Sequence, residues 1–158
     1  MIKALVFDLS RTLLFPVDKN YQGKLNALYK ELKDASGFSF LDHFRLDENI
    51  MIYLRSLKKT CNLYIFTSGI IQDDPAIKPR LEEIFEKVFS AEKMGLNKKD
   101  MNAYTKLSKE LGFKSYEIKL IDDSEVNVKA ARSAGINAVL FSSLNDLRKK
   151  IQEHLSSN

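Results

Sequence analysis

Short apolar runs alternate along the chain with longer amphipathic stretches. The runs at residues 4–7, 63–66, 118–121 and 138–141 are rich in β-branched or aromatic side chains, and a weaker fifth run lies at 87–89. Runs of this kind predict strands that are covered on both faces. Apolar residues recur at helical spacing in residues 21–33, 48–59, 76–86, 102–111, 125–134 and 144–154. The alternation predicts an α/β protein built on a mostly parallel sheet.

The chain length and the lack of internal division favour one domain over residues 1–158. Gly112 and Gly135 stand where two of the predicted helices should end. The least regular segment is 16–47, which is either a reduced helical cap insertion or a crossover helix followed by a long loop. Its aromatic residues favour core packing over the lining of an entrance.

Composition narrows the classes of partner. The chain has 44% hydrophobic and 29% charged residues, with a net charge of +4 and a pI near 9.0. The lysine pairs at 58–59, 98–99 and 149–150 are spread along the chain and form no basic block, so no nucleic-acid partner is expected. No apolar stretch is long enough to span a bilayer, so we expect no membrane association and, by default, a cytoplasmic location.

Polar residues gather where the predicted strands end. These positions are Asp8-Leu9-Ser10-Arg11-Thr12, Thr67-Ser68-Gly69 and Asp122-Asp123-Ser124, with Lys98 in a loop before a helix. Binding sites of open α/β sheets form beyond the carboxyl ends of the strands, so these side chains are expected to surround one crevice.

The residue types in this crevice suit phosphoryl transfer. A carboxylate can attack phosphorus, neighbouring carboxylates can hold Mg²⁺, and an ammonium and hydroxyl groups can stabilise the phosphoryl oxygens. Singly, each position has an ordinary structural explanation: Asp8 as a capping turn, Lys98 as a solvated surface lysine. The adjacent Asp122 and Asp123 are more informative, because like charges at a strand end are costly unless a cation is bound.

The order and spacing of these motifs resemble the haloacid dehalogenase-like superfamily. The matching segments are VFDLSRT, YIFTSG, GLNKKD and LIDDSEVN, and the similarity extends from Ile2 to about Phe141, with 16–47 unmatched. The resemblance implies a three-layer Rossmann-like fold with a mainly parallel five-stranded sheet and a small or absent cap. It also implies a Mg²⁺-dependent phosphatase that forms an aspartyl-phosphate intermediate.

Carried over position by position, the resemblance assigns a role to each motif residue. Asp8 would be the nucleophile and a metal ligand, Ser10 would offer its backbone carbonyl to Mg²⁺, and Asp122 and Asp123 would complete the metal site. Substrate contacts would come from Thr67, Ser68, Gly69, Lys98 and Arg11, with Thr67 and Lys98 also acting in catalysis.

Two departures from the family pattern affect the expected activity. Ser10 replaces the usual second acid, and loss of general acid–base catalysis typically costs about 10²- to 10⁴-fold. Arg11 replaces a small glycine, and either reaches a substrate anion or lies at the surface. A reduced cap would leave the crevice open to small or macromolecular phosphorylated substrates.

Three alternatives to a phosphatase stand beside it. A catalytically reduced protein would bind a phosphorylated ligand or a protein partner without turnover. A dehalogenase also lacks the second acid, but it needs no metal, so the Asp122-Asp123 pair speaks against it. A receiver domain is disfavoured because its acidic pair follows the first strand, whereas here the pair follows the fourth apolar run.

Overall fold

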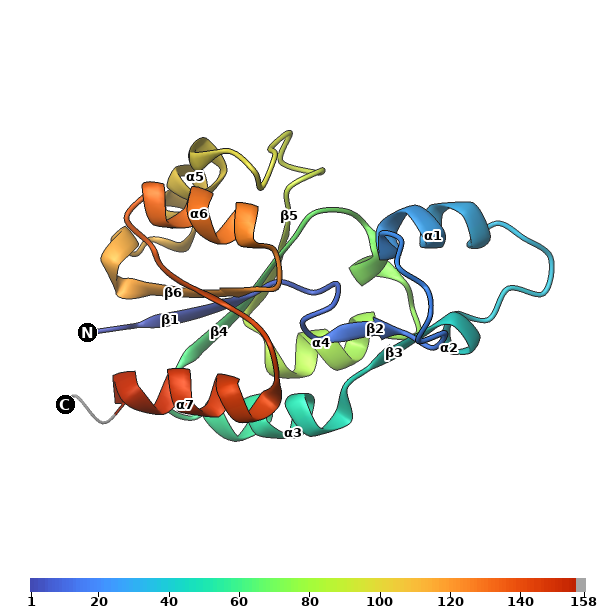
Figure 1. Ribbon diagram of the computed structural model, residues 1–158, viewed down its shortest axis with the longest axis horizontal. Helices are drawn as coiled ribbons and strands as arrows, with labels where there is room; N and C mark the ends of the chain where they lie inside the picture. Colours follow the sequence, from blue (N-terminus) through green and yellow to red (C-terminus); the bar gives the residue numbers. More distant parts are fainter. Residues whose placement is uncertain (156–158) are drawn as a thin grey trace.

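The computed structural model describes residues 1–155 and is built around a five-stranded parallel sheet (Figure 1). Its strands are β1 (Ala4–Phe7), β4 (Asn62–Thr67), β5 (Lys87–Ser90), β6 (Ile118–Asp122) and β7 (Asn137–Leu140). Their order across the sheet is β5-β4-β1-β6-β7. Numbered along the chain, these strands read 3-2-1-4-5, which is the Rossmann order and differs from the 2-1-3-4-5 order of receiver domains. The predicted α/β, Rossmann-like fold is therefore confirmed, including its weak fifth strand.

Helices cover both faces of the sheet and complete three layers. Figure 1 shows α3 (Glu48–Leu57), α4 (Lys78–Ile84) and α7 (Leu144–Leu155) below the sheet, with α5 (Met101–Leu111) and α6 (Glu125–Ser133) above it. Two short 3-10 turns, η1 (Ile71–Asp73) and η2 (Ser115–Glu117), lie in the connections. The six predicted helices are present. Their ends differ from prediction by at most two residues, except that the helix predicted at 21–33 is α1 (Leu25–Leu32).

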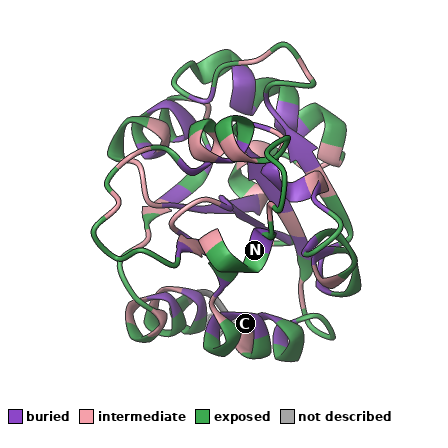
Figure 2. Ribbon diagram, turned by 90° about the vertical axis from the view of Figure 1, so that its right-hand side faces the viewer, coloured by how far each residue is buried: buried purple, intermediate pink, exposed green. Residues whose placement is uncertain are grey.

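The central strand β1 shows why the sheet needs two helical layers. Leu5 and Phe7 pack into the core cluster that contains residues of α3, α4 and α7, whereas Ala4 and Val6 pack into the cluster that contains residues of α5 and α6. All four side chains are buried, as is typical of a parallel strand covered on both faces. Figure 2 shows the same division, with buried residues on the strands and exposed ones on the outer sides of the helices.

Local capping explains several helix ends. Asp47 precedes α3, and its carboxylate accepts a hydrogen bond from the Ile50 amide at 3.0 Å, which satisfies one of the free donors of the first turn. Gly112 ends α5 with φ of 72°, and Gly135 follows α6 with φ of 81°. Both glycines adopt the left-handed conformation expected of them.

Residues 17–43 form an insert between two short strands that sequence periodicity did not predict. β2 (Leu14–Pro16) and β3 (Phe44–Leu46) pair antiparallel, and the insert between them carries α1 (Leu25–Leu32) and α2 (Phe40–His43). The crossover from β1 to β4 over the sheet is made by α3, whereas α1 lies beyond the carboxyl ends of the strands (Figure 1). The segment thus places a helix next to the strand ends that carry the candidate site.

The insert adds a group of aromatic rings to the core cluster on the α3, α4 and α7 side of the sheet. The ring of Tyr29 meets those of Phe38, Phe40 and Phe44 edge to face, with centroids 6.0 to 6.2 Å apart. Phe40 and Phe44 are buried, and Phe38 is half-buried. Edge-to-face packing at these distances is favourable, so the aromatic residues of this segment pack together as the sequence predicted.

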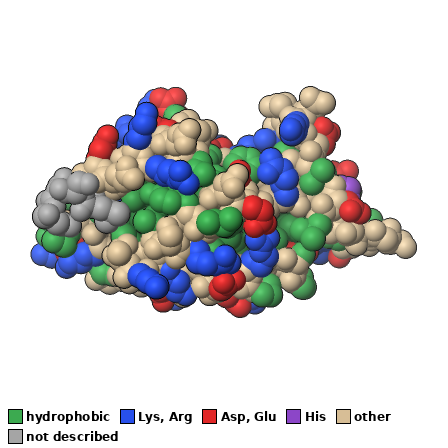
Figure 3. All heavy atoms as spheres, turned by 90° about the horizontal axis from the view of Figure 1, so that it is seen from below, with side chains coloured by type: hydrophobic (Ala, Val, Ile, Leu, Met, Phe, Trp, Pro, Cys, Tyr) green, Lys and Arg blue, Asp and Glu red, His purple; other side chains and the backbone are tan. Residues whose placement is uncertain are grey.

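The view of Figure 3 shows no concentrated basic face. Within residues 1–155, no helix is long and apolar enough to cross a bilayer. On the face seen in Figure 3, Lys and Arg side chains alternate with Asp, Glu and apolar groups.

The helix α3 allows a direct test of the packing. Leu54 is 0% exposed and Ile52 is 60% exposed on the same helix. We expect Leu54→Ala to lower the free energy of unfolding by about 2–5 kcal/mol, because it removes buried methyl groups and leaves a cavity. Ile52→Ala should change it by less than about 0.5 kcal/mol. Chemical denaturation of both variants measures the difference, and equal losses would show that α3 does not pack as described.

Candidate functional site

Lys98 lies between two carboxylates at the carboxyl ends of the central strands. Its Nζ is 2.7 Å from Asp8 Oδ1 and 2.8 Å from Asp122 Oδ2, and it also donates to the Phe66 carbonyl oxygen at 2.8 Å. An ammonium has three hydrogens to donate, and these three acceptors use all of them. The side chain therefore links the ends of β1, β4 and β6.

The cluster is almost closed to solvent. Lys98 is 3% exposed, Asp8 6% and Asp122 0%. Burial raises the pKa of Asp8 well above its usual value, although the nearby Lys98 opposes that shift. Burial alone would lower the pKa of Lys98, but Asp8 and Asp122 outweigh it and raise the pKa, so Lys98 remains a cation. Lys98 is not the solvated lysine that its sequence context suggested.

Backbone contacts fix the loop that delivers Lys98. After β5, the Ala91 amide donates to the Thr67 carbonyl at 2.8 Å, and the Glu92 amide donates to the Ser68 carbonyl at 3.0 Å. Ser90 Oγ donates to the Gly69 carbonyl at 2.7 Å. These bonds join the loops after β4 and β5, which places Lys98 near the predicted Thr67-Ser68-Gly69 segment.

Three carboxylates form a candidate metal centre. Asp8, Asp122 and Asp123 each offer an oxygen, and these oxygens lie within 4.8 Å of one another. Asp122 is further oriented by the Ser124 amide at 2.9 Å and by Asn127 Nδ2 at 3.1 and 3.3 Å from its two oxygens. If all three carboxylates are ionised, they and the Lys98 ammonium carry a charge of −3 + 1 = −2. Oxygen ligands and this excess charge suit a hard divalent cation.

The loop after β1 folds into a single tight turn. The Leu9 carbonyl accepts from the amides of Thr12, Leu13 and Leu14 at 3.2, 2.9 and 2.9 Å. The turn brings Ser10 and Thr12 beside the strand end that carries Asp8, before the chain continues into β2.

Several hydroxyl groups near these strand ends lack a hydrogen-bond partner. Within the described part of the chain, the hydroxyl oxygens of Ser10, Thr12 and Thr67 are buried and accept or donate no hydrogen bond. Buried polar groups rarely remain unpaired, so a bound water or a ligand would satisfy each of these hydroxyls. Thr67 is the residue predicted to contact a phosphoryl group. Thr12 was part of the recognised motif but had no assigned role.

Ser68 and Gly69, the next two predicted substrate contacts, differ in exposure. Ser68 is exposed, whereas Gly69 is buried and its carbonyl accepts from both Ser90 Oγ and Gln72 Nε2, the latter at 2.8 Å. The backbone of this loop is therefore held firmly while the Ser68 side chain remains accessible.

Arg11 contacts the insert. Its backbone has φ of 60°, in the left-handed region, which costs a non-glycine residue about 1 kcal/mol. Its Nη2 donates to the carbonyl oxygens of Tyr21 at 2.9 Å and Gly23 at 2.7 Å. This nitrogen therefore binds backbone carbonyls of the insert, so the Arg11 side chain does not lie free at the surface. Its contact with a substrate anion stays a prediction.

Two residues near the site were not assigned from the sequence. Asn127 orients Asp122, and its place in the LIDDSEVN segment five residues after Asp122 was the available sign. Tyr104 is fully buried, its hydroxyl has no partner among residues 1–155, and its ring meets Phe66 edge to face at 5.7 Å. Burial raises the pKa of the Tyr104 phenol, so its hydroxyl stays protonated. Its helical spacing in α5 suggested only core packing.

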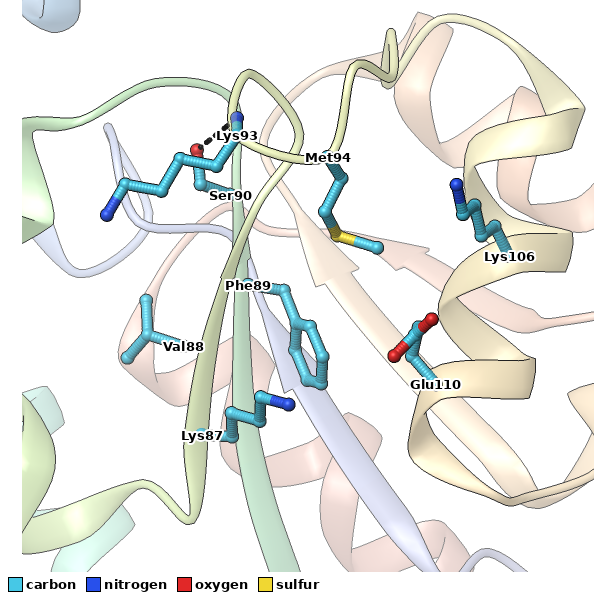
Figure 4. Close-up of a pocket in the computed structure, with 8 residues that line it drawn as sticks. All are labelled: Lys87, Val88, Phe89, Ser90, Lys93, Met94, Lys106 and Glu110. Atoms are coloured by element: carbon cyan, nitrogen blue, oxygen red, sulfur yellow. Dashed lines mark hydrogen bonds between the residues drawn. The ribbon is translucent and has the colours of Figure 1, made fainter.

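A separate surface pocket lies at the edge strand β5. It has a volume of about 340 Å³, and Figure 4 shows Lys87 and Phe89 on β5 facing Lys106 and Glu110 on α5. The Lys87 ammonium lies 4.8 Å from the centre of the Phe89 ring, and Lys93 pairs with Asp73. These cations are already engaged, and the pocket contains none of the three clustered carboxylates.

Solved structures with the same fold come from several bacteria. A HAD family enzyme from Bacteroides thetaiotaomicron, determined with magnesium and inorganic phosphate, has a TM-score of 0.69 at 17% identity, covering 91% of this chain and 96% of that one. A predicted HAD-like family hydrolase from Porphyromonas gingivalis has a TM-score of 0.69 at 18% identity, covering 98% of each chain. A 2-haloacid dehalogenase from Pseudomonas syringae has a TM-score of 0.63 at 16% identity, covering 89% of this chain and 86% of that one.

Sequence comparisons agree with the fold. Drimenol cyclase from Aspergillus calidoustus is 25% identical over an alignment of 138 residues, and the match covers 80% of this chain. The chain spans 26% of the length of that cyclase. The family described as haloacid dehalogenase-like hydrolase matches residues 8–141, from the candidate nucleophile to the end of the last strand. This chain therefore belongs to the haloacid dehalogenase-like hydrolases.

Proposed function

We propose that the protein is a Mg²⁺-dependent phosphatase whose nucleophile is Asp8. The observation that carries this proposal is the buried cluster in which Lys98 contacts Asp8 and Asp122 while Asp123 completes a set of three close carboxylates. Such a cluster offers a nucleophile, a fixed cation and oxygen ligands at one point.

The reaction would take place in two steps. An oxygen of Asp8 attacks the phosphorus of a phosphate monoester, the bond to the leaving oxygen breaks, and that oxygen takes a proton from solvent. Water then attacks the phosphorus of the aspartyl phosphate, releasing inorganic phosphate and the Asp8 carboxylate. Lys98 stabilises negative charge on the phosphoryl oxygens, and Thr67, Ser68 and Gly69 supply neutral hydrogen-bond donors.

Mg²⁺ would be held by Asp8, the Ser10 carbonyl, Asp122 and Asp123. Bound there, it would neutralise charge on the phosphoryl group and on the three carboxylates. The closeness of the three carboxylates, which a divalent cation would hold in their ionised form, and the unpaired Thr67 hydroxyl support this assignment.

Ser10 limits the substrates that should react quickly. A hydroxyl neither protonates a leaving oxygen nor activates water near neutral pH. Aryl and acyl phosphates have leaving groups that need little protonation, so we propose them as the better substrates.

A second candidate function is binding of a phosphorylated ligand without turnover, and Ser10 is the observation that favours it. Dehalogenation is less well supported, because it makes no use of a cation site and three close carboxylates would oppose one another without one.

The phosphatase proposal predicts Mg²⁺-dependent release of inorganic phosphate from aryl and acyl phosphates. Asp8→Asn should reduce release to the uncatalysed background, because the amide does not attack phosphorus. A colorimetric phosphate assay with and without Mg²⁺ measures both effects. Wild-type protein that releases no phosphate from the panel with Mg²⁺ would contradict turnover and leave ligand binding as the function.

The role of Ser10 can be tested by restoring the acid. Ser10→Asp should raise kcat/KM for alkyl phosphates by about 10²- to 10⁴-fold and for aryl phosphates by much less. Ser10→Ala is the matched control, since it keeps the backbone carbonyl and adds no acid. If Ser10→Asp accelerates both substrate classes equally, the missing acid is not what limits the reaction.

The metal centre predicts stabilisation by Mg²⁺ alone. At a concentration of 100 times Kd, Mg²⁺ should add about 2.7 kcal/mol to the free energy of unfolding, because it binds the folded chain. Asp123→Asn should lose most of that gain, whereas Glu125→Gln, at an exposed acid two residues away, should keep it. Denaturant titrations with and without Mg²⁺ provide the measurement, and an equal gain in both variants would count against the assigned ligands.

A further inference from the structure

The first residues of the insert are fastened to loops on two sides of the crevice. On one side, Arg11, three residues after Asp8, donates from Nη2 to the carbonyl oxygens of Tyr21 and Gly23. On the other side, Asn26 Oδ1 accepts from the amides of Ile70 and Ile71, each at 3.1 Å. Residues 21–26 therefore bridge the loop that follows the nucleophile and the loop that follows Thr67.

The Asn26 contact is close as well as polar. A Cβ atom placed on Gly69 would overlap Asn26 Oδ1, so a side chain at that position would require the Asn26 side chain to move. Gly69 is two residues after Thr67, so Asn26 packs directly against the segment proposed to bind the phosphoryl group.

Further contacts continue along α1. Tyr29 donates its hydroxyl proton to Asp74 Oδ2 at 3.0 Å in a buried hydrogen bond, and Lys30 pairs with Glu92 at 2.9 Å. Asp74 follows η1, and Glu92 follows β5. The helix thus contacts the connections after β4 and β5. It lies beyond the carboxyl ends of the strands (Figure 1).

The left-handed backbone of Arg11 indicates that its side chain is kept at this position for its contacts. Glycine adopts φ of 60° without steric cost, so an arginine there retains backbone strain that the simplest residue would avoid. What the arginine adds is the pair of charge-assisted hydrogen bonds to the insert.

We propose that Arg11 and Asn26 are positioning residues that hold the start of the insert against the crevice and thereby restrict it to small phosphorylated substrates. Asp8 and Thr67 are almost fully buried, and α1 lies beyond the strand ends that carry them (Figure 1), so a phosphorylated group must pass the insert to reach them. The restriction to small substrates rests on the proposed function, whereas the positioning of the insert does not.

Amide hydrogen exchange at Ile70 and Ile71 tests the positioning without requiring turnover. Asn26→Ala should speed exchange at both amides by about tenfold or more, because they lose their acceptor. Asn26→Asp retains an acceptor oxygen and should stay close to the wild type. Equal acceleration by both substitutions would overturn the role of the Asn26 oxygen.

Arg11→Gly is compared with the wild type in the same exchange experiment. The substitution removes the side chain that holds the insert, and glycine adopts the left-handed backbone without strain. It should also speed exchange at Ile70 and Ile71, although Arg11 touches neither residue, since both contacts hold the same segment. Thermal unfolding confirms that the variant is folded. Unchanged exchange at Ile70 and Ile71 in folded Arg11→Gly would show that the two contacts act independently and would overturn the proposal.

The substrate restriction is tested by comparing p-nitrophenyl phosphate with a folded protein carrying phosphotyrosine. Arg11→Gly and Asn26→Ala should each raise kcat/KM for the phosphoprotein relative to the small substrate by about tenfold, and Asn26→Asp should not. A constant ratio across all variants would overturn the restriction. Altered hydrogen exchange with no turnover of either substrate would refute the phosphatase proposal and the restriction that rests on it, but not the positioning role.

Discussion

A single buried ammonium holds the carboxyl ends of three strands together. Lys98 contacts Asp8 after β1, Asp122 at the end of β6 and the Phe66 carbonyl in β4. A buried charge is costly unless it is paired and hydrogen-bonded, and removing one partner of a buried pair costs about 3–5 kcal/mol. Because the loops after these strands also form the candidate site, the same interaction constrains both the fold and the chemistry.

The charge balance of the cluster connects stability with function. Three close carboxylates are only partly neutralised by Lys98, and burial raises the pKa of both Asp8 and Asp123. The carboxylates repel one another when they are ionised. A bound divalent cation would reduce this repulsion and favour their ionised form. The backbone of Arg11 is a second locally unfavourable feature near the site. Strained conformations of this kind are typically kept at functional sites.

Sequence pattern was sufficient for the main sheet and insufficient for the insert. The three central strands β1, β4 and β6 are rich in apolar residues because most of their side chains are buried, so their apolar runs were visible. β2 and β3 are three residues each, and β2 ends in a proline, so neither shows an alternation that could be read. Their pairing joins residues about 30 positions apart in the sequence, so it depends on how the segment between them folds.

The order of the motifs predicted which carboxylates come together at the candidate site. It did not predict the side-chain contacts that depend on the folded arrangement of the loops. Asp8, Asp122 and Asp123 follow buried strands, and parallel strands bring such ends together. The burial of Lys98 could be suspected only from its place among the motifs, because lysine is usually exposed. The contact of Arg11 with Tyr21 and Gly23 depends on a left-handed backbone and on two carbonyl groups, neither of which leaves a mark in the sequence.

The most direct test is a crystal structure with Mg²⁺ and a fluoride mimic of the phosphoryl group. One magnesium ion should lie within about 2.0–2.1 Å of oxygens from Asp8, the Ser10 carbonyl and the Asp122-Asp123 pair, with the mimic next to Asp8 and Lys98. A structure in which Asp8 and the acidic pair share no ion, or in which the mimic binds away from Lys98, would contradict the assignment of this crevice as a phosphoryl-transfer site.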